Sequence, residues 1–247
     1  MTTLEIPYNR KAVDPVACIK AGWELVKPQY WLFVGMTFIA FFIGSAVPLG
    51  ILMGPMMCGI YLTCFARLRR EPVEFGLLFK GFDFFGPSLI ATLIHVVPIV
   101  AILVPTYVLF YASLVLALMA QGNEPNPAAL LGILGTFSLV VLVVVVLIVI
   151  ISIGFTFAYP LIVDRRLKGV DAVKLSFKAA MANFWRLLAM GLLTAVMGMV
   201  GMAFCYVGMF LVFPISYGAI ATAYEQVFGL AHAREASNLP PPPPIFE

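Results

Sequence analysis

The sequence predicts an all-α polytopic membrane protein with six transmembrane helices. Hydrophobic residues make up 62% of its 247 positions and charged residues only 11%, whereas soluble domains carry about 25% charged residues. Several runs of at least about 18 residues lack any charge, which is the usual signature of membrane helices. A membrane β-barrel would instead show alternating segments of about 10 residues. We expect the six helices to form three hairpins, each preceded by a cytoplasmic amphipathic helix.

The first unit follows a polar leader, residues 1–13, that lacks the apolar core of a cleaved signal peptide. Asp14 and Pro15 predict a helix start, because Asp is a favoured N-cap and Pro suits the first helical position. The helix that follows has an apolar and a basic face, which is typical of helices in the headgroup layer of a membrane. Two spans, 30–47 and 49–66, complete this unit.

The second unit begins with an aromatic amphipathic segment, residues 75–85, and continues into two uncharged runs, 87–120 and 128–163. A helix through either run would be about 50 Å long, against about 30 Å for the hydrocarbon core. Each run is either one tilted or protruding span, or a span joined to an interfacial piece, with Pro98 and Pro105 as break points in the first. We favour one long span each, which gives a hairpin that overshoots the bilayer.

The third unit follows a basic turn at Asp164 and consists of an amphipathic helix and two spans, about 184–204 and 206–228. Asp171 is the expected N-cap of the amphipathic helix. Residues 230–247 form a cytoplasmic tail, whose five consecutive prolines impose the stiff, extended polyproline II conformation.

The distribution of positive charge predicts which side of the membrane each connection faces. All fifteen Lys and Arg residues lie in the leader with the first amphipathic helix, in the connections 67–80 and 165–186, and in the tail. The opposite turns, near 45–49, 121–127 and 204–208, contain none. Because cytoplasmic loops are enriched in Lys and Arg, both termini are expected in the cytoplasm.

An internal repeat relates the first unit to the third. At an offset of 154 positions, residues 19–31 align with residues 173–185 without a gap, so that Trp31 meets Trp185. At an offset of 159, the pattern Pro55-x3-Gly59 corresponds to Pro214-x3-Gly218. Chance similarity between two amphipathic membrane sequences is the alternative explanation.

The middle unit matches less closely, through Phe79-Lys80 and Phe177-Lys178. All three units would enter the membrane from the same side, which makes them parallel repeats. The chain is therefore expected to hold a single six-span membrane domain, 14–229, of three repeat units, about 14–66, 72–163 and 170–229.

Three loose motifs carry a family resemblance. They are Gly22-Trp23 with Trp31, Arg70-Glu71-Pro72 with Leu78 to Phe82, and Pro160 to Asp164 with Ala172 to Ser176 and Asn183 to Trp185. In these motifs the chain resembles the YciC-like proteins, uncharacterised six-helix proteins of the bacterial inner membrane, and the membrane domain attached to some glycerophosphodiester phosphodiesterases. The resemblance implies a multi-pass protein of the bacterial inner membrane and no established activity. The sequence contains no soluble phosphodiesterase domain, so that activity is not carried over.

Basic and aromatic residues at the ends of the predicted spans are candidate contacts with lipid headgroups. A Lys or Arg near an anionic membrane surface contributes about 1 kcal/mol to binding, and charge that merely sets topology is the alternative explanation. The candidates are Lys20, Trp23, Lys27, Trp31, Arg69, Arg70, Lys80, Arg165, Arg166, Lys174, Lys178 and Trp185.

His95 is the one residue deep within a predicted span, apart from tyrosines and cysteines, that ionises. It is a candidate intramembrane polar site, because such residues often belong to ion or proton pathways. We favour the simpler interpretation of a neutral His bonded to a neighbouring helix. Asp164 and Glu225 are expected at cytoplasmic span ends, where they pair with the basic residues of 165–168 or bind an ion.

The sequence shows no arrangement of residues that indicates catalysis or metal binding. It has no Ser/His/Asp set, Gly-rich phosphate loop or pair of buried carboxylates, and its four Cys residues show no CxxC spacing. We therefore expect no enzymatic activity, no cofactor and no metal. In the tail, Pro240, Pro244, Ile245 and Phe246 are candidates for docking into an aromatic groove of a partner, with a plain linker as the alternative.

These observations favour a non-enzymatic membrane scaffold or accessory subunit. It would organise membrane lipids, anionic ones included, or a cytoplasmic or membrane protein partner at the cytoplasmic face, without nucleic acid. The alternative is a small transporter or flippase for an apolar or lipid-like molecule, and a lipid-modifying enzyme is a third option. A polar cavity near His95, Tyr107, Tyr111 and Thr156 would favour transport, and a sealed apolar interior would favour the scaffold.

Overall fold

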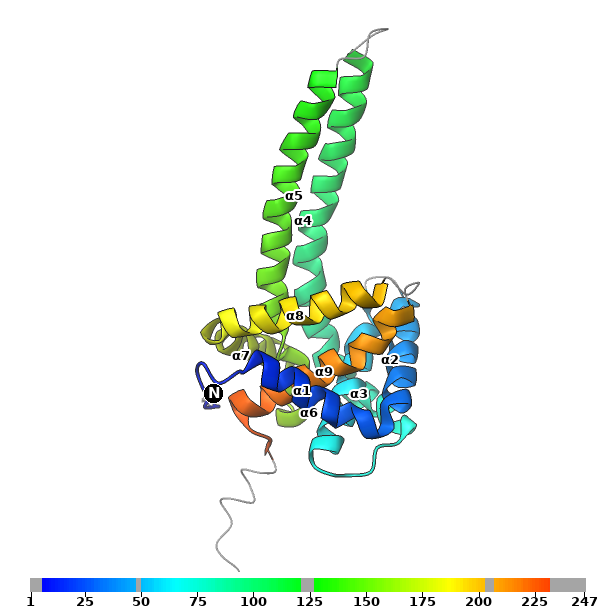
Figure 1. Ribbon diagram of the computed structural model, residues 1–247, viewed down its shortest axis with the longest axis vertical. Helices are drawn as coiled ribbons and strands as arrows, with labels where there is room; N and C mark the ends of the chain where they lie inside the picture. The colour runs from blue at the N-terminus through cyan, green and yellow to red at the C-terminus, as the bar shows by residue number, and fades with distance from the viewer. Residues whose placement is uncertain (1–5, 48–49, 121–126, 203–206, 232–247) are drawn as a thin grey trace, which may run out of the picture.

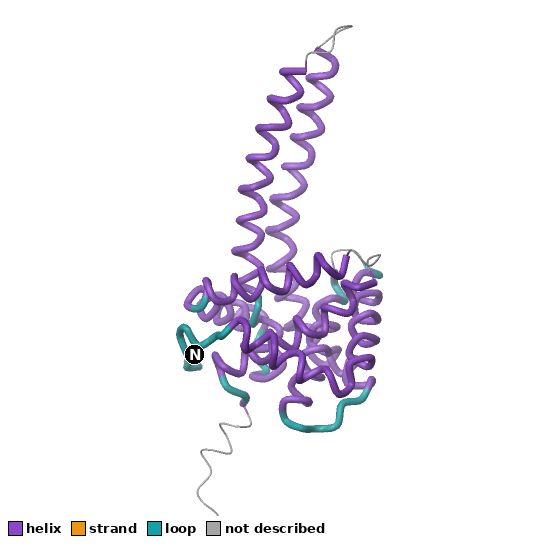
Figure 2. Tube along the Cα trace, in the orientation of Figure 1, coloured by secondary structure: helices purple, strands orange, loops and turns teal. Residues whose placement is uncertain are grey.

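The computed structural model describes residues 6–47, 50–120, 127–202 and 207–231. These residues form a bundle of helices from which one long hairpin projects (Figure 1), and none of them is in a β-strand (Figure 2). Four helical stretches are long and apolar enough to cross a membrane: Pro15–Ser45, Phe75–Ala117, Leu131–Arg165 and Phe184–Met202. The prediction of an all-α membrane protein is therefore confirmed, while the number of complete spans stays a prediction.

The first unit forms the helices α1 (Pro15–Val26), α2 (Tyr30–Ser45) and α3 (Met53–Leu68), with a short 3-10 turn η1 (Lys27–Gln29) after α1. The predicted N-cap is confirmed, because the Asp14 carboxylate accepts hydrogen bonds from the backbone N–H groups of Val16 and Ala17, each at 3.1 Å. Part of the leader is docked on the bundle, where Asn9 donates its backbone N–H to the carbonyl of Val227.

The second unit contains η3 (Phe75–Phe84), α4 (Phe85–Ala120), α5 (Pro127–Phe155) and α6 (Ala158–Arg165). The aromatic segment is a 3-10 helix whose buried residues, Leu78 and Gly81, are three positions apart, as expected for three residues per turn. The structure confirms that the first uncharged run is one continuous helix, since α4 passes through both of its prolines.

The run 128–163 was expected to be one long span, and most of it belongs to the single candidate span Leu131–Arg165, which one turn interrupts. The helix breaks at residues 156–157, between α5 and α6. Ser176 of a later helix stabilises the break, because its hydroxyl donates to the Gly154 carbonyl at 2.6 Å and accepts from the Phe157 N–H at 3.1 Å. One buried hydroxyl thus satisfies two backbone groups freed by the break, which a membrane protein requires.

The third unit forms α7 (Gly169–Ala182), α8 (Phe184–Met202) and α9 (Val207–Phe228). The prediction of Asp171 as N-cap is wrong, because α7 begins two residues earlier and its N-cap is Lys168. Asp171 lies instead in the first turn, where its negative charge still interacts favourably with the helix dipole.

The helix starts of the first and third units keep the offset of 154 positions. Pro15 and Gly169 begin α1 and α7, and Tyr30 and Phe184 begin α2 and α8. The buried faces of α1 and α7 also correspond. The matching pairs are Cys18 with Ala172, Gly22 with Ser176, and Val26 with Ala180, all of them buried.

Each amphipathic segment packs on the second hairpin helix of another unit. Helix α1 packs on α9, η3 packs on α3, and α7 packs on α5. The first two contacts are close because glycines meet there, and a Cβ on Gly22 or on Gly59 would collide with the backbone of Gly218 or Leu78 respectively. Unit 1 therefore docks on unit 3, unit 2 on unit 1, and unit 3 on unit 2, so the three units form a closed ring.

Candidate functional site

Helices α3, α6 and α9, the last helix of each unit, end close together, and a left-handed residue follows each of them. Arg70 follows α3 with φ 60°, Arg166 follows α6 with φ 50°, and Gly229 follows α9 with φ 64°. A left-handed residue at this position is a common way to end a helix. After α3, the Glu71 N–H bonds to the Ala66 carbonyl at 2.9 Å, as in a Schellman motif.

Asp164 occupies the point where these three helix ends meet. Its side chain is fully buried, and it accepts a hydrogen bond from Arg69 Nη2 at 2.9 Å and one from the Tyr224 hydroxyl at 2.9 Å. The backbone N–H of Ala231 lies 3.2 Å from its Oδ2. Arg165 Nε lies 3.1 Å from the same oxygen, forming an ion pair without hydrogen-bond geometry. We call Asp164 and these four partners the helix-end hub.

Arg165 links the hub to the third unit. Its Nη2 donates to the Phe228 carbonyl at 3.3 Å and to the Gly229 carbonyl at 2.8 Å. The carbonyls at the end of a helix have no partner within the helix and carry partial negative charge, so a guanidinium there is favourable. The hub therefore joins α3, α6 and α9, one helix from each unit, through ionic and polar contacts.

The geometry of the hub suits a structural clamp. A buried carboxylate is costly unless it is paired and fully hydrogen-bonded, and both oxygens of Asp164 have partners. The donors that bond to the Asp164 carboxylate all belong to the protein itself. Arg69 and Arg165 are correspondingly withdrawn from the surface, with 23% and 15% of their side chains exposed.

The hub was predicted only in part. Asp164 was expected to pair with a neighbouring basic residue, and Arg165 does so. The pairing with Arg69, which lies 95 positions away, was missed, as was Tyr224. The sequence feature that could have indicated the contact between Arg69 and Asp164 is the presence of charged residues at the ends of corresponding helices. Glu225 is exposed, and within the described ranges it forms no ion pair.

The other candidate headgroup contacts lie on the surface. The exposed basic residues are Lys20, Lys27, Arg70, Lys80, Arg166, Lys174 and Lys178, and the exposed tryptophans are Trp23, Trp31 and Trp185. Trp31 and Trp185, which correspond in the repeat, are 75% and 77% exposed. The structure thus separates the twelve predicted residues into ten on the surface and two, Arg69 and Arg165, in the hub.

His95 lies at the base of the projecting hairpin and packs on α5. Its ring stacks on Phe155, with 4.5 Å between centroids and 10° between planes. Its Nε2 atom is buried and has no hydrogen-bond partner among the described residues, so the expected bond from this atom to a neighbouring helix is absent there. Nearby, the hydroxyls of Thr92 on α4 and Tyr159 on α6 lie 3.1 Å apart.

The four residues whose polar cavity would favour transport do not come together. Tyr107 and Tyr111 face outward from α4 and line a surface groove of about 800 Å³ without His95 or Thr156. The remaining lining is apolar: Val108, Ala112, Val115, Leu116 and Met119. A second groove, of about 530 Å³, lies between α8 and α9 and is also lined by apolar residues.

Two further predictions concern metal binding and the tail. The described ranges contain no group of three or more His, Cys, Asp or Glu side chains placed to hold a metal. Pro240, Pro244, Ile245 and Phe246 lie outside the described residues. Comparison with protein-family models, with curated proteins and with solved structures finds no match to this chain.

Proposed function

We propose that the chain is a non-enzymatic membrane scaffold that organises lipids or a partner complex at the cytoplasmic face of the bacterial inner membrane. The observation that carries the proposal is the division of its charges. The buried carboxylate of Asp164 is held by the chain's own groups, whereas the basic residues of α1, η3 and α7 are exposed. The buried charges thus hold the helices together, and the exposed basic residues can bind a lipid or a partner.

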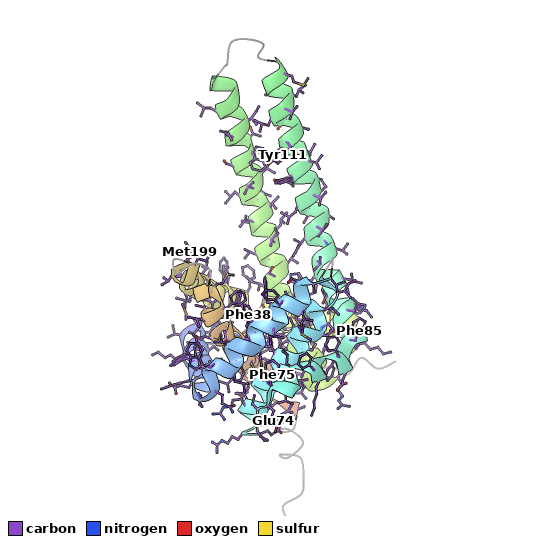
Figure 3. All side chains as sticks on the ribbon, turned by 90° about the vertical axis from the view of Figure 1, so that its right-hand side faces the viewer. Phe38, Glu74, Phe75, Phe85, Tyr111 and Met199 are labelled. Carbon is purple, nitrogen blue, oxygen red and sulfur yellow. The ribbon has the colours of Figure 1, made fainter. Side chains whose placement is uncertain are left out.

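The proposed topology has three hairpins entering the membrane from the cytoplasm, with both termini on that side. The basic connections support it through the positive-inside rule. Figure 3 places Glu74, in the connection before η3, at the end of the bundle remote from Tyr111 on the projecting hairpin. The bacterial inner membrane is the location implied by the resemblance to YciC-like proteins.

Anionic lipid headgroups are the proposed ligands of the exposed basic residues. Each cation near an anionic surface contributes about 1 kcal/mol, so Lys20, Lys27, Lys174 and Lys178 together contribute about 4 kcal/mol. The exposed tryptophans are suited to the same layer, because their rings favour the membrane interface.

Purification into native nanodiscs tests this proposal. We expect the wild type to retain more phosphatidylglycerol, relative to phosphatidylethanolamine, than the surrounding membrane. Replacing the four lysines by Gln should abolish the enrichment, and replacing them by Arg should preserve it. Co-purifying proteins are identified from the same discs. A wild type that carries bulk lipid and no specific protein contradicts the scaffold.

A small transporter or flippase is the second candidate, and the unpartnered Nε2 of His95 favours it. Buried polar groups normally have partners, so one without any calls for an explanation. Reconstitution in vesicles that contain fluorescent lipids tests this function. Transport predicts lipid movement that the His95→Phe variant lacks, and equal rates in protein-free vesicles contradict it.

A further inference from the structure

We propose that only the α4–α5 hairpin crosses the whole bilayer. The hairpins α2–α3 and α8–α9 enter from the cytoplasmic side and end before the far surface, with their apolar faces in contact with the acyl chains of the near leaflet. This inference requires only that the protein is inserted in a membrane, and it does not depend on the scaffold role. It replaces six complete spans by two, and it leaves both termini on the cytoplasmic side.

The first argument is the length of the helices. Helices α2 and α3 have 16 residues each and are about 24 Å long, less than the roughly 30 Å of hydrocarbon even when upright. Helix α8 has 19 residues, but it runs across the base of the projecting hairpin and not alongside it (Figure 1). Of the helices in the two short hairpins, α2, as part of Pro15–Ser45, and α8 are among the described stretches long and apolar enough to cross a membrane, whereas the second helices of these hairpins, α3 and α9, are not.

The second argument is the exposed length of the hairpin. On α4, Phe85 and Ile90 are exposed in the part of the helix that packs on the bundle, and beyond it exposed apolar side chains extend from Val97 to Met119, a distance of about 33 Å along the helix. On α5 they extend from Leu131 to Val149, about 27 Å. Both distances match one hydrocarbon thickness. If the bundle occupied the full bilayer, this apolar surface would lie in water, which the hydrophobic effect opposes.

The third argument is the hydrogen bonding of the hairpin's hydroxyl groups. Hydrocarbon offers no partner, so polar groups there need one within the protein. Each Ser and Thr in the exposed part donates to a carbonyl of its own helix, and the Tyr107 hydroxyl donates to that of Tyr111 at 3.1 Å. The Ser and Thr bonds are Thr106 to Ile102, Ser113 to Phe110, Thr136 to Gly132 and Ser138 to Leu134, at 2.7 to 2.9 Å.

The fourth argument is the polarity of the connecting sequences. The sequence of the long hairpin's turn, 121–126, is Gln-Gly-Asn-Glu-Pro-Asn, which requires water. The other two connections are Ala-Val-Pro-Leu-Gly-Ile-Leu at 46–52 and Ala-Phe-Cys-Tyr at 203–206, and neither contains a charged residue or an amide side chain. Only the long hairpin therefore has a turn suited to the aqueous phase beyond the membrane.

The exposed faces of the short hairpins fit the near leaflet. Phe38 on α2 and Met199 on α8 lie toward the hairpin end of the bundle, away from Glu74 (Figure 3). Both are exposed, with 70% of Met199 accessible. Trp31, at the start of α2, then lies at the level of the cytoplasmic headgroups.

Labelling of single introduced cysteines tests the inference. The background carries Cys205→Ala and keeps Cys18, Cys58 and Cys64, which are buried. In right-side-out vesicles, a membrane-impermeant maleimide should label Gln121→Cys at least about ten times faster than Ser45→Cys or Met202→Cys, since alkylation needs a hydrated thiolate. Glu74→Cys, the cytoplasmic control, should react only after the vesicles are opened. Equal labelling of Ser45→Cys and Gln121→Cys, or no labelling of Gln121→Cys, overturns the inference.

Spin labels on α4 provide a second test at exposed positions that tolerate substitution. A label at Val108→Cys, midway between Val97 and Met119, should show the highest accessibility to oxygen and the lowest to a water-soluble nickel chelate. Labels at Val97→Cys and Met119→Cys should both be more accessible to nickel. With six complete spans, nickel accessibility would instead rise steadily from Val97 through Val108 to Met119. That profile overturns the inference, whatever lipid or partner the protein binds.

Discussion

Arg69 and Asp164 lie 95 positions apart in the chain, and 2.9 Å separates Nη2 of the first from Oδ1 of the second. The pair connects the end of α3 to the end of α6, and Tyr224 of α9 holds the other carboxylate oxygen. Each of the three units therefore contributes to the surroundings of a single carboxylate. The consequences of this arrangement for stability are testable.

Arg69→Met should destabilise the protein by about 3 kcal/mol, because removing one partner of a buried ion pair leaves an uncompensated charge. Arg70→Met is the matched control. It removes the same charge at the next position, where the side chain is exposed, and should change stability by less than about 0.5 kcal/mol. Unfolding in detergent, followed by the loss of the monodisperse chromatographic peak, measures both. Equal effects of the two substitutions would show that the pair contributes nothing.

Gly22→Ala should destabilise the contact between α1 and α9 by about 1–3 kcal/mol, since the added methyl group would collide with the backbone of Gly218 and Ala219. Gly35→Ala is the control, because no atom lies within 4 Å of the added group there. In a helix this control should be stabilising by about 0.5–1 kcal/mol. Thermal unfolding of the two variants in the same detergent distinguishes them. A Gly22→Ala variant as stable as Gly35→Ala would contradict the close approach.

Arg166→Gly should leave stability unchanged or raise it by up to about 1 kcal/mol. Its φ of 50° strains any residue that has a Cβ, and Gly removes that strain at some cost in unfolded-state entropy. Arg166→Val should lower stability by about 1 kcal/mol or more, because β-branched residues tolerate this conformation poorly. If the Val variant matches the Gly variant in thermal unfolding, the left-handed helix end is wrong.

Cys18 on α1 should react slowly with alkylating reagents. Burial raises the pKa of its thiol above the ordinary value near 9, so at pH 8 the folded protein holds less thiolate than the unfolded chain. Alkylation by iodoacetamide should be at least about ten times slower than after unfolding in sodium dodecyl sulfate, with Cys18→Ser as the blank. Because the folded pKa is the higher one, the stability due to the neutral thiol is retained below pH 9 and lost above it. Equal rates of alkylation would place Cys18 on the surface.

Local patterns predicted much of the fold. The Asp14 N-cap and the continuous α4 follow from neighbouring residues, and the structure shows both. The break before Ala158 was not predictable from its own apolar sequence, because Ser176 of another helix stabilises it. The Asp171 prediction failed because a helix start depends on where the preceding chain turns, and that turn is set here by the left-handed Arg166.

The candidate site was harder to predict than the fold. A sequence pattern identifies Asp164 as a charge beside an apolar run, but it does not show which distant guanidinium comes close to it. Arg69 and Arg165 therefore looked like headgroup ligands equivalent to Arg70 and Arg166. Their different environments arise from the meeting of three helix ends, which is a property of tertiary packing.

The docking of α1 on α9 sets an order of events during biosynthesis. The main partner of α1 is α9, the last of the described helices, so α1 must wait until the chain has been synthesised to about residue 228. Its amphipathic character lets it rest at the membrane surface during that time. A ribosome that stalls before residue 207 would release a chain whose glycine face on α1 has no partner. Such a chain would lack the contact between α1 and α9 that closes the ring of three units.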